Sequence, residues 1–178
     1  MDGDRLAREQ DPAYRATLLY PLLFNWAMDL KIAADSYAQA TAEFLSVANQ
    51  LTEVELDASN TGGWTARQVI HHVADSEAQS YARLRRLIAE PGSIIQGYDE
   101  AGWGENETLG YKDLPIAQSL EVFKAVRASS LEIIKRLNPN QLDNSGTHSQ
   151  SGKYTVWTWL ETYISHPLEH CVQIKSGL

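Results

Sequence analysis

Apolar residues recur at helical spacing along four long segments of the chain. The segments are separated by stretches rich in glycine, proline, asparagine and serine, which favour turns. Four such segments in one chain predict an all-α fold, a four-helix bundle with long connecting loops. The predicted helices cover residues 23–51, 65–90, 115–137 and 155–175.

The ends of these helices carry local signals. Thr65 and Gln68 form a Thr-x-x-Gln capping box at the start of the second helix, and Pro91-Gly92 stops it. Proline lies in the first turn of the third helix, and Gly177 follows the fourth. The residues expected to face inward are Val69, Val73, Leu84 and Leu87 in the second helix and Leu120, Phe123, Val126, Leu131, Ile134 and Leu137 in the third.

Two connections, residues 91–114 and 138–154, are longer than helix connections usually need, and long loops in compact domains often carry function. In the first, Tyr98 and Trp103 are candidates for the wall of a substrate pocket. Trp64, just before the second helix, is a third candidate. Ordinary aromatic packing remains the alternative for all three.

Composition narrows the class of protein. The 178 residues predict a single domain over 1–178, with residues 1–20 as an N-terminal extension. The longest apolar stretch, residues 16–28, is interrupted by polar residues and proline, and the acidic start does not resemble a signal peptide, so we expect a cytoplasmic protein without a membrane span. A net charge of −8 disfavours nucleic acid and anionic membranes as partners.

Five histidines and one cysteine offer the chain's candidate ligand chemistry. Cys171 excludes an internal disulfide and is expected to be a small core residue. His166 and His170 are four positions apart, so their side chains rise from one helical face, close enough for one metal ion. Histidine pairs with this spacing are more often ordinary surface or core residues than metal ligands. Pro167 between them removes a backbone hydrogen bond.

A third ligand would have to come from His71, His72 or His148. His148 lies in a polar loop and is expected to be solvated. Adjacent helical positions are turned by roughly 100°, so His71 and His72 are not expected to point into the same site. Periodicity favours His72 only slightly and leaves the choice open.

Three stretches together resemble a known family. GGWTARQVIHHVADSEAQSY (62–81), GYDEAGW (97–103) and HPLEHCVQI (166–174) resemble the DinB/YfiT-like superfamily, in particular its YfiT-like branch related to bacillithiol S-transferases. The resemblance implies a four-helix bundle in which His72, His166 and His170 bind one divalent metal ion, zinc or nickel, completed by water. His71 would then face outward or support a ligand. A homodimer is also implied. The branch commonly carries further histidines after HHVADS, where this chain has Glu77.

The expected function follows from an open three-histidine site. Three neutral imidazoles leave the charge of the ion uncompensated, which activates a bound water or thiol. We therefore expect a metal-dependent enzyme that transfers a low-molecular-weight thiol to an electrophilic small molecule, or hydrolyses one. Asp75 is the candidate catalytic residue, because it could orient the ring of His71 or His72. The alternatives are a sequestering protein without turnover and a dimeric scaffold whose site has decayed.

Overall fold

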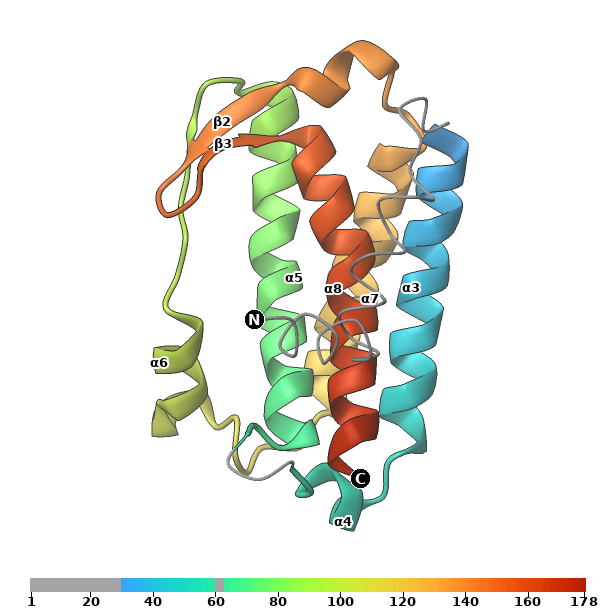
Figure 1. The fold of residues 1–178 in the computed structure, drawn as a ribbon, viewed down its shortest axis with the longest axis vertical. Helices are drawn as coiled ribbons and strands as arrows, with labels where there is room; N and C mark the ends of the chain where they lie inside the picture. Colours follow the sequence, from blue (N-terminus) through green and yellow to red (C-terminus); the bar gives the residue numbers. More distant parts are fainter. Residues whose placement is uncertain (1–29, 60–62) are drawn as a thin grey trace, which may run out of the picture.

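Four long helices form a bundle, as predicted from the sequence (Figure 1). The computed structural model describes residues 30–59 and 63–178. The long helices are α3 (Leu30–Gln50), α5 (Ala66–Ala89), α7 (Ala117–Ile134) and α8 (Val156–Gly177). The shorter elements are α4 (Glu53–Leu56), α6 (Glu100–Glu105), η1 (Glu107–Leu109), η2 (Pro139–Asp143), β1 (Ile94–Ile95), β2 (Ser145–His148) and β3 (Gly152–Thr155).

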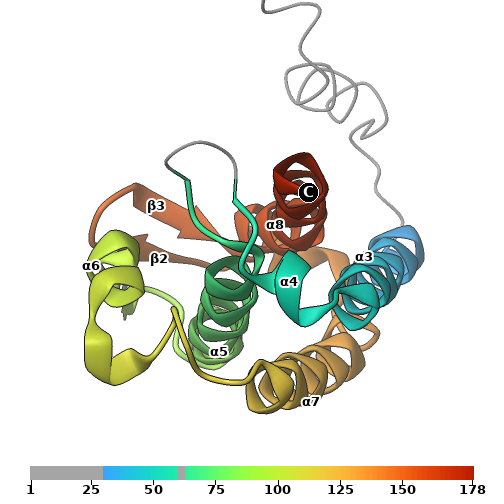
Figure 2. The same cartoon turned by 90° about the horizontal axis from the view of Figure 1, so that it is seen from below.

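The direction of the helices explains the first long connection. Helices α5 and α7 run one way and α3 and α8 run the other (Figure 1). Seen along the bundle, α5 packs beside α7 and α8, and α3 packs beside the same two helices (Figure 2). Because α5 and α7 are parallel neighbours, the chain between them must return along the whole bundle. Residues 91–114 do so, and α6 lies on this return path.

The helix ends agree with the sequence signals to within a few residues. The Thr65 hydroxyl accepts the Gln68 backbone N–H, and the Gln68 side chain accepts the Thr65 N–H, so the capping box is confirmed. Helix α7 is shorter than predicted at both ends, and α8 extends through Gly177. The predicted start of the first helix at residue 23 and the extension 1–20 lie outside the described residues.

The core confirms most of the predicted inward face and corrects one part of it. Cys171 is buried among apolar side chains of α3, α5 and α7, as expected of a core residue, and burial raises its pKa to about 11. On α7, however, Val126 is only half-buried, whereas the neighbouring Arg127 is 1% exposed. The inward face of α7 therefore keeps its predicted direction, but at this turn its buried position is occupied by Arg127 and not by the apolar Val126.

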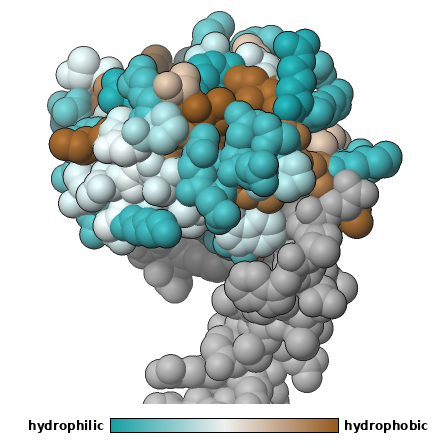
Figure 3. Space-filling model, turned by 90° about the horizontal axis from the view of Figure 1, so that it is seen from above, coloured by the Kyte–Doolittle hydropathy of each residue, from teal (hydrophilic) through white to brown (hydrophobic). Residues whose placement is uncertain are grey.

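A small three-stranded sheet lies beside the bundle near the end of α5, on the side where α6 lies (Figure 2), and the all-α pattern did not predict it. Strand β2 pairs in parallel with β1 and antiparallel with β3. The strands are two to four residues long and mostly polar, so they lack the alternation that indicates a strand. Figure 3 views this end and shows polar side chains around a limited apolar area. None of the helices in the described ranges is long and apolar enough to cross a membrane.

Candidate metal centre

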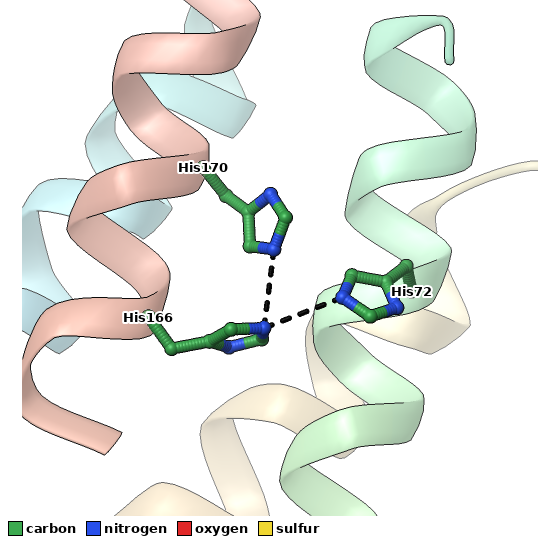
Figure 4. A group of neighbouring side chains, drawn as sticks. All are labelled: His72, His166 and His170. Atoms are coloured by element: carbon green, nitrogen blue, oxygen red, sulfur yellow. Dashed lines mark hydrogen bonds between the residues drawn. The ribbon is translucent and has the colours of Figure 1, made fainter. Parts of the chain in front are cut away.

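Three histidine rings meet between α5 and α8 (Figure 4). The His166 Nε2 atom lies 3.3 Å from His72 Nε2 and 3.1 Å from His170 Nε2. One ring nitrogen from each residue lies within 4.8 Å of the others. His72 comes from the first half of α5, His166 from the middle of α8 and His170 from its second half, so residues almost 100 positions apart converge at one point.

The tertiary structure decides between the two adjacent histidines of α5. His72 is 3% exposed and faces α8, where its ring meets those of His166 and His170. His71 is turned away from the cluster. Its Nδ1 lies 2.8 Å from Ser119 Oγ and its Nε2 lies 3.1 Å from the Leu114 carbonyl oxygen. Both nitrogens of His71 are thus occupied by protein groups.

The hydrogen bonds of the cluster leave it ready for a cation. The His170 Nδ1 atom donates to Gln173 Oε1 at 2.7 Å, which leaves the lone pair of His170 Nε2 directed at the cluster. The Nδ1 atoms of His72 and His166 are buried without a hydrogen-bond partner. Zinc–nitrogen bonds of about 2.0–2.1 Å in a tetrahedral arrangement place two ligand nitrogens about 3.3 Å apart, so the observed separations fit such an ion.

The rings are held neutral, which is the form that binds metal. Burial lowers the pKa of His72 to about 4, and the neighbouring His170 adds to the shift. Burial also lowers the pKa of His166 well below its ordinary value, and it lowers that of His170 despite the opposing hydrogen bond to Gln173. Protons therefore compete weakly for these nitrogens at neutral pH.

Pro167 interrupts α8 between the two histidines, and a side chain from α7 compensates for the interruption. A proline at this position has no N–H for the Tyr163 carbonyl, four residues earlier. The Arg127 Nη1 atom donates to that carbonyl oxygen at 2.8 Å. The missing backbone hydrogen bond is thereby replaced next to His166, and α8 continues through the proline as a helix.

Arg127 is the centre of a buried polar cluster that joins all four long helices. Its Nη1 also donates to the Glu77 carboxylate at 2.6 Å, and both side chains have 0% exposure. Its Nε donates to Thr41 Oγ1 at 2.6 Å and its Nη2 to the Tyr37 carbonyl oxygen at 2.8 Å. Burial raises the pKa of Glu77, while Arg127 acts in the opposite direction.

Sequence reasoning missed this cluster, although a signal was present. Glu77 lies seven residues after Ile70 and seven before Leu84, both of which are fully buried. A seven-residue interval keeps a side chain on nearly the same helical face. A carboxylate at such a position predicts a buried cation on another helix.

Asp75 does not hold either histidine ring. Its carboxylate accepts a 2.6 Å hydrogen bond from the Tyr111 hydroxyl, and within residues 30–59 and 63–178 it makes no hydrogen bond to His71 or His72. The expected orienting contact is therefore corrected: Asp75 anchors the segment that leads into α7. Its catalytic role stays a prediction.

The three aromatic candidates lie in two places. The Trp64 ring packs edge-on to His72, with 5.1 Å between centroids, so it borders the cluster. Tyr98 and Trp103 contact each other at 4.6 Å in the loop that carries α6. Their predicted contact with substrate stays a prediction. His148 lies in the β2–β3 hairpin, where its Nδ1 accepts backbone N–H groups, and it takes no part in the cluster.

The fold is a four-helix bundle in which α5 and α7 run parallel to each other and antiparallel to α3 and α8. Between α5 and α8 it holds a three-histidine cluster suited to a divalent metal ion. Residues 36–174 match the family model of the DinB superfamily. This match covers most of the chain, which therefore belongs to the DinB superfamily, and the resemblance noted in the sequence is confirmed.

Individual relatives agree with this assignment. The chain is 35% identical over 127 residues to a protein of Oceanobacillus iheyensis named "putative metal-dependent hydrolase", covering 71% of this chain and 72% of the relative. A Bacillus pumilus protein of the same name is 32% identical, with 79% of each chain covered. Among solved structures, YfiT from Bacillus subtilis, described as a probable metal-dependent hydrolase with an unusual four-helix bundle topology, matches with a TM-score of 0.77 at 24% identity, covering 86% of this chain and 87% of that one.

Proposed function

We propose that this protein is a metal-dependent hydrolase of small molecules, with His72, His166 and His170 as the ligands of one divalent ion, zinc or nickel. The observation that carries the proposal is the convergence of three neutral Nε2 atoms at 3.1 and 3.3 Å. The names of the relatives in Oceanobacillus iheyensis and Bacillus pumilus support the same reaction class.

In the proposed reaction, the metal ion and the protein side chains would have different roles. When bound, the ion supplies a Lewis acid that lowers the pKa of a water or thiol in its open position toward about 7. The three imidazoles hold the ion without cancelling its charge. The Gln173 side chain fixes the ring of His170, and the Trp64 ring packs edge-on against that of His72.

Thiol transfer to an electrophile is the second candidate, and the placement of Asp75 favours it. Among the described residues, no carboxylate makes a hydrogen bond to the three rings, and Asp75 is engaged by Tyr111. No described carboxylate is therefore held at the rings to accept the proton of a bound water, so hydrolysis would depend on the ion alone to lower the pKa of that water. A thiol, with an ordinary pKa of about 8.5, needs much less help to lose its proton.

Metal content and turnover test the proposal together. We expect untagged protein to carry about one equivalent of zinc or nickel by elemental analysis. The loaded protein should hydrolyse an activated ester such as 4-nitrophenyl acetate, or join a thiol to monochlorobimane. His166→Ala should lose both metal and activity while its helical circular dichroism is retained. His148→Gln, which changes a histidine outside the cluster, is the matched control and should keep both.

Different outcomes separate the alternatives. Activity that survives in His166→Ala at the wild-type level contradicts the proposed role of the cluster. Metal with stoichiometric ligand binding and no product indicates a sequestering protein. Protein that binds neither metal nor ligand is a scaffold.

A further inference from the structure

We infer that Arg83 is a specificity-determining residue that binds a carboxylate group of the substrate, so that the preferred substrates are small organic monoanions. The inference rests on the proposed function, because it assigns a substrate class to the same site. It starts from an arginine that faces the site and has no anionic partner.

Arg83 lies on the side of α5 that carries His72. The two residues are eleven positions apart, which is about three turns, so their side chains leave the helix in nearly the same direction. The Arg83 Nη1 atom donates to the Tyr163 hydroxyl at 3.0 Å, and the Tyr163 ring lies 6.1 Å from the ring of His166. The guanidinium therefore sits on the seam between α5 and α8, one aromatic ring away from the histidine cluster.

The charge of Arg83 is not neutralised by the described part of the chain. Within residues 30–59 and 63–178 it forms no ion pair; its partners are the Tyr163 hydroxyl and the Gln96 carbonyl oxygen, both uncharged. Its Nε atom is buried and has no hydrogen-bond partner. Two other arginines with buried side chains do have anionic partners: Arg67 pairs with two carboxylates and Arg127 pairs with Glu77.

The surroundings of Arg83 suit an anion. Burial raises the pKa of the hydroxyls of Tyr98, Tyr154 and Tyr163, and the charge of Arg83 acts in the opposite direction on all three, which places it among three phenols. The Tyr98 hydroxyl is buried without a hydrogen-bond partner and is a potential second donor. Glu77, the buried acid nearby, is already paired with Arg127. A single guanidinium with phenol donors matches one carboxylate in charge and in hydrogen-bonding geometry.

The spacing sets the shape of the substrate. Three turns of helix span roughly 16 Å, and the arginine side chain leans back toward the N-terminus, so the guanidinium is on the order of 10 Å from the cluster. A molecule that reaches both points carries its carboxylate about one benzene ring away from its reacting group.

A matched pair of esters tests the inference. The probes are 4-acetoxybenzoate, which carries a carboxylate, and its neutral methyl ester. We expect the zinc-loaded wild-type protein to prefer the carboxylate in kcat/KM by about tenfold to a hundredfold, mainly through KM. Arg83→Gln should lose this preference, so that the variant's kcat/KM for the carboxylate falls to its own value for the neutral ester. Arg85→Gln is the control, because Arg85 stacks on Tyr81 and donates to Ser129 away from the site, and it should keep the preference.

A binding measurement separates this inference from the proposed function. Calorimetry with the unreactive amides 4-acetamidobenzoate and its methyl ester should show the same preference in wild type and its loss in Arg83→Gln, even if neither ester is hydrolysed. Absence of hydrolysis with this binding pattern contradicts only the hydrolase proposal. Wild-type protein that binds both amides equally or not at all, or an Arg83→Gln variant that keeps the preference, overturns the role of Arg83.

Discussion

The bundle buries two groups of polar side chains within about a turn or two of each other, and they differ in how fully their atoms are paired. In the Arg127–Glu77 cluster, each guanidinium nitrogen donates to an oxygen from α3, α5 or α8. In the histidine cluster, three Nε2 atoms face one another and two Nδ1 atoms have no partner.

This difference indicates that the Arg127–Glu77 cluster is structural, whereas the histidine cluster can bind a ligand. A buried polar cluster that is fully paired needs no further ligand and fixes the helices relative to one another. Buried nitrogens that lack partners are costly unless something binds them. The Arg127–Glu77 cluster therefore holds the histidine cluster in place, through the Tyr163 carbonyl beside His166, and the histidine cluster is the one that gathers unpartnered ring nitrogens at a single point.

The largest expected effect comes from breaking the paired cluster. Arg127→Met leaves the Glu77 carboxylate buried without a cation, and we expect the free energy of unfolding to fall by about 3–5 kcal/mol in urea denaturation. Lys124→Met, which removes an exposed ion pair with Glu121 on the same helix, should cost less than about 0.5 kcal/mol. Adding Glu77→Leu to Arg127→Met should recover much of the loss. A single-variant loss below about 1 kcal/mol contradicts the proposed role of this cluster.

The unpaired cluster should make the metal-free protein sensitive to acid. Because the pKa of His72 is about 4 in the fold and about 6.5 when unfolded, the unfolded chain binds more protons between these values, and stability falls as pH drops below 6.5. Between pH 7.5 and 5.0 this histidine alone should cost roughly 2 kcal/mol.

Urea denaturation of chelator-treated protein at the two pH values measures the acid sensitivity. His72→Gln removes the titrating ring. Between pH 7.5 and 5.0 its free energy of unfolding should therefore fall by roughly 2 kcal/mol less than that of the wild type. If the free energy of unfolding falls equally in the two proteins, His72 is not the source of the acid sensitivity.

The smallest effect is expected where the two clusters meet. A carbonyl oxygen accepts two hydrogen bonds, so Pro167→Ala should give Tyr163 a helical partner without displacing Arg127. Since Arg127 already offsets the missing bond, we expect the gain in stability to stay under about 1 kcal/mol, well below the ~3 kcal/mol usually ascribed to an interior proline. In an Arg127→Met background the same substitution should stabilise more. A double-mutant cycle measures the difference, and strict additivity would show that Arg127 and Pro167 are not coupled.

Much of the architecture could be predicted from the sequence because its signals are local. The capping box of Thr65 and Gln68 acts within one turn, and the spacing of His166 and His170 places both on one face whatever the rest of the fold does. The four helices follow from apolar periodicity within each segment. The polar sheet was not predictable in this way, because its strands are held by pairing between distant segments.

Other features were decided only when the helices came together. Periodicity left His71 and His72 nearly equivalent; the positions of α7 and α8 gave His71 protein partners and His72 the other two histidines. Likewise, the sequence alone does not distinguish Glu77 and Arg127 from ordinary surface charges, and only the packing of the bundle pairs them. The physical reason is that helix formation depends on neighbours along the chain, whereas the burial and pairing of a polar group depend on residues that only the tertiary fold brings within reach.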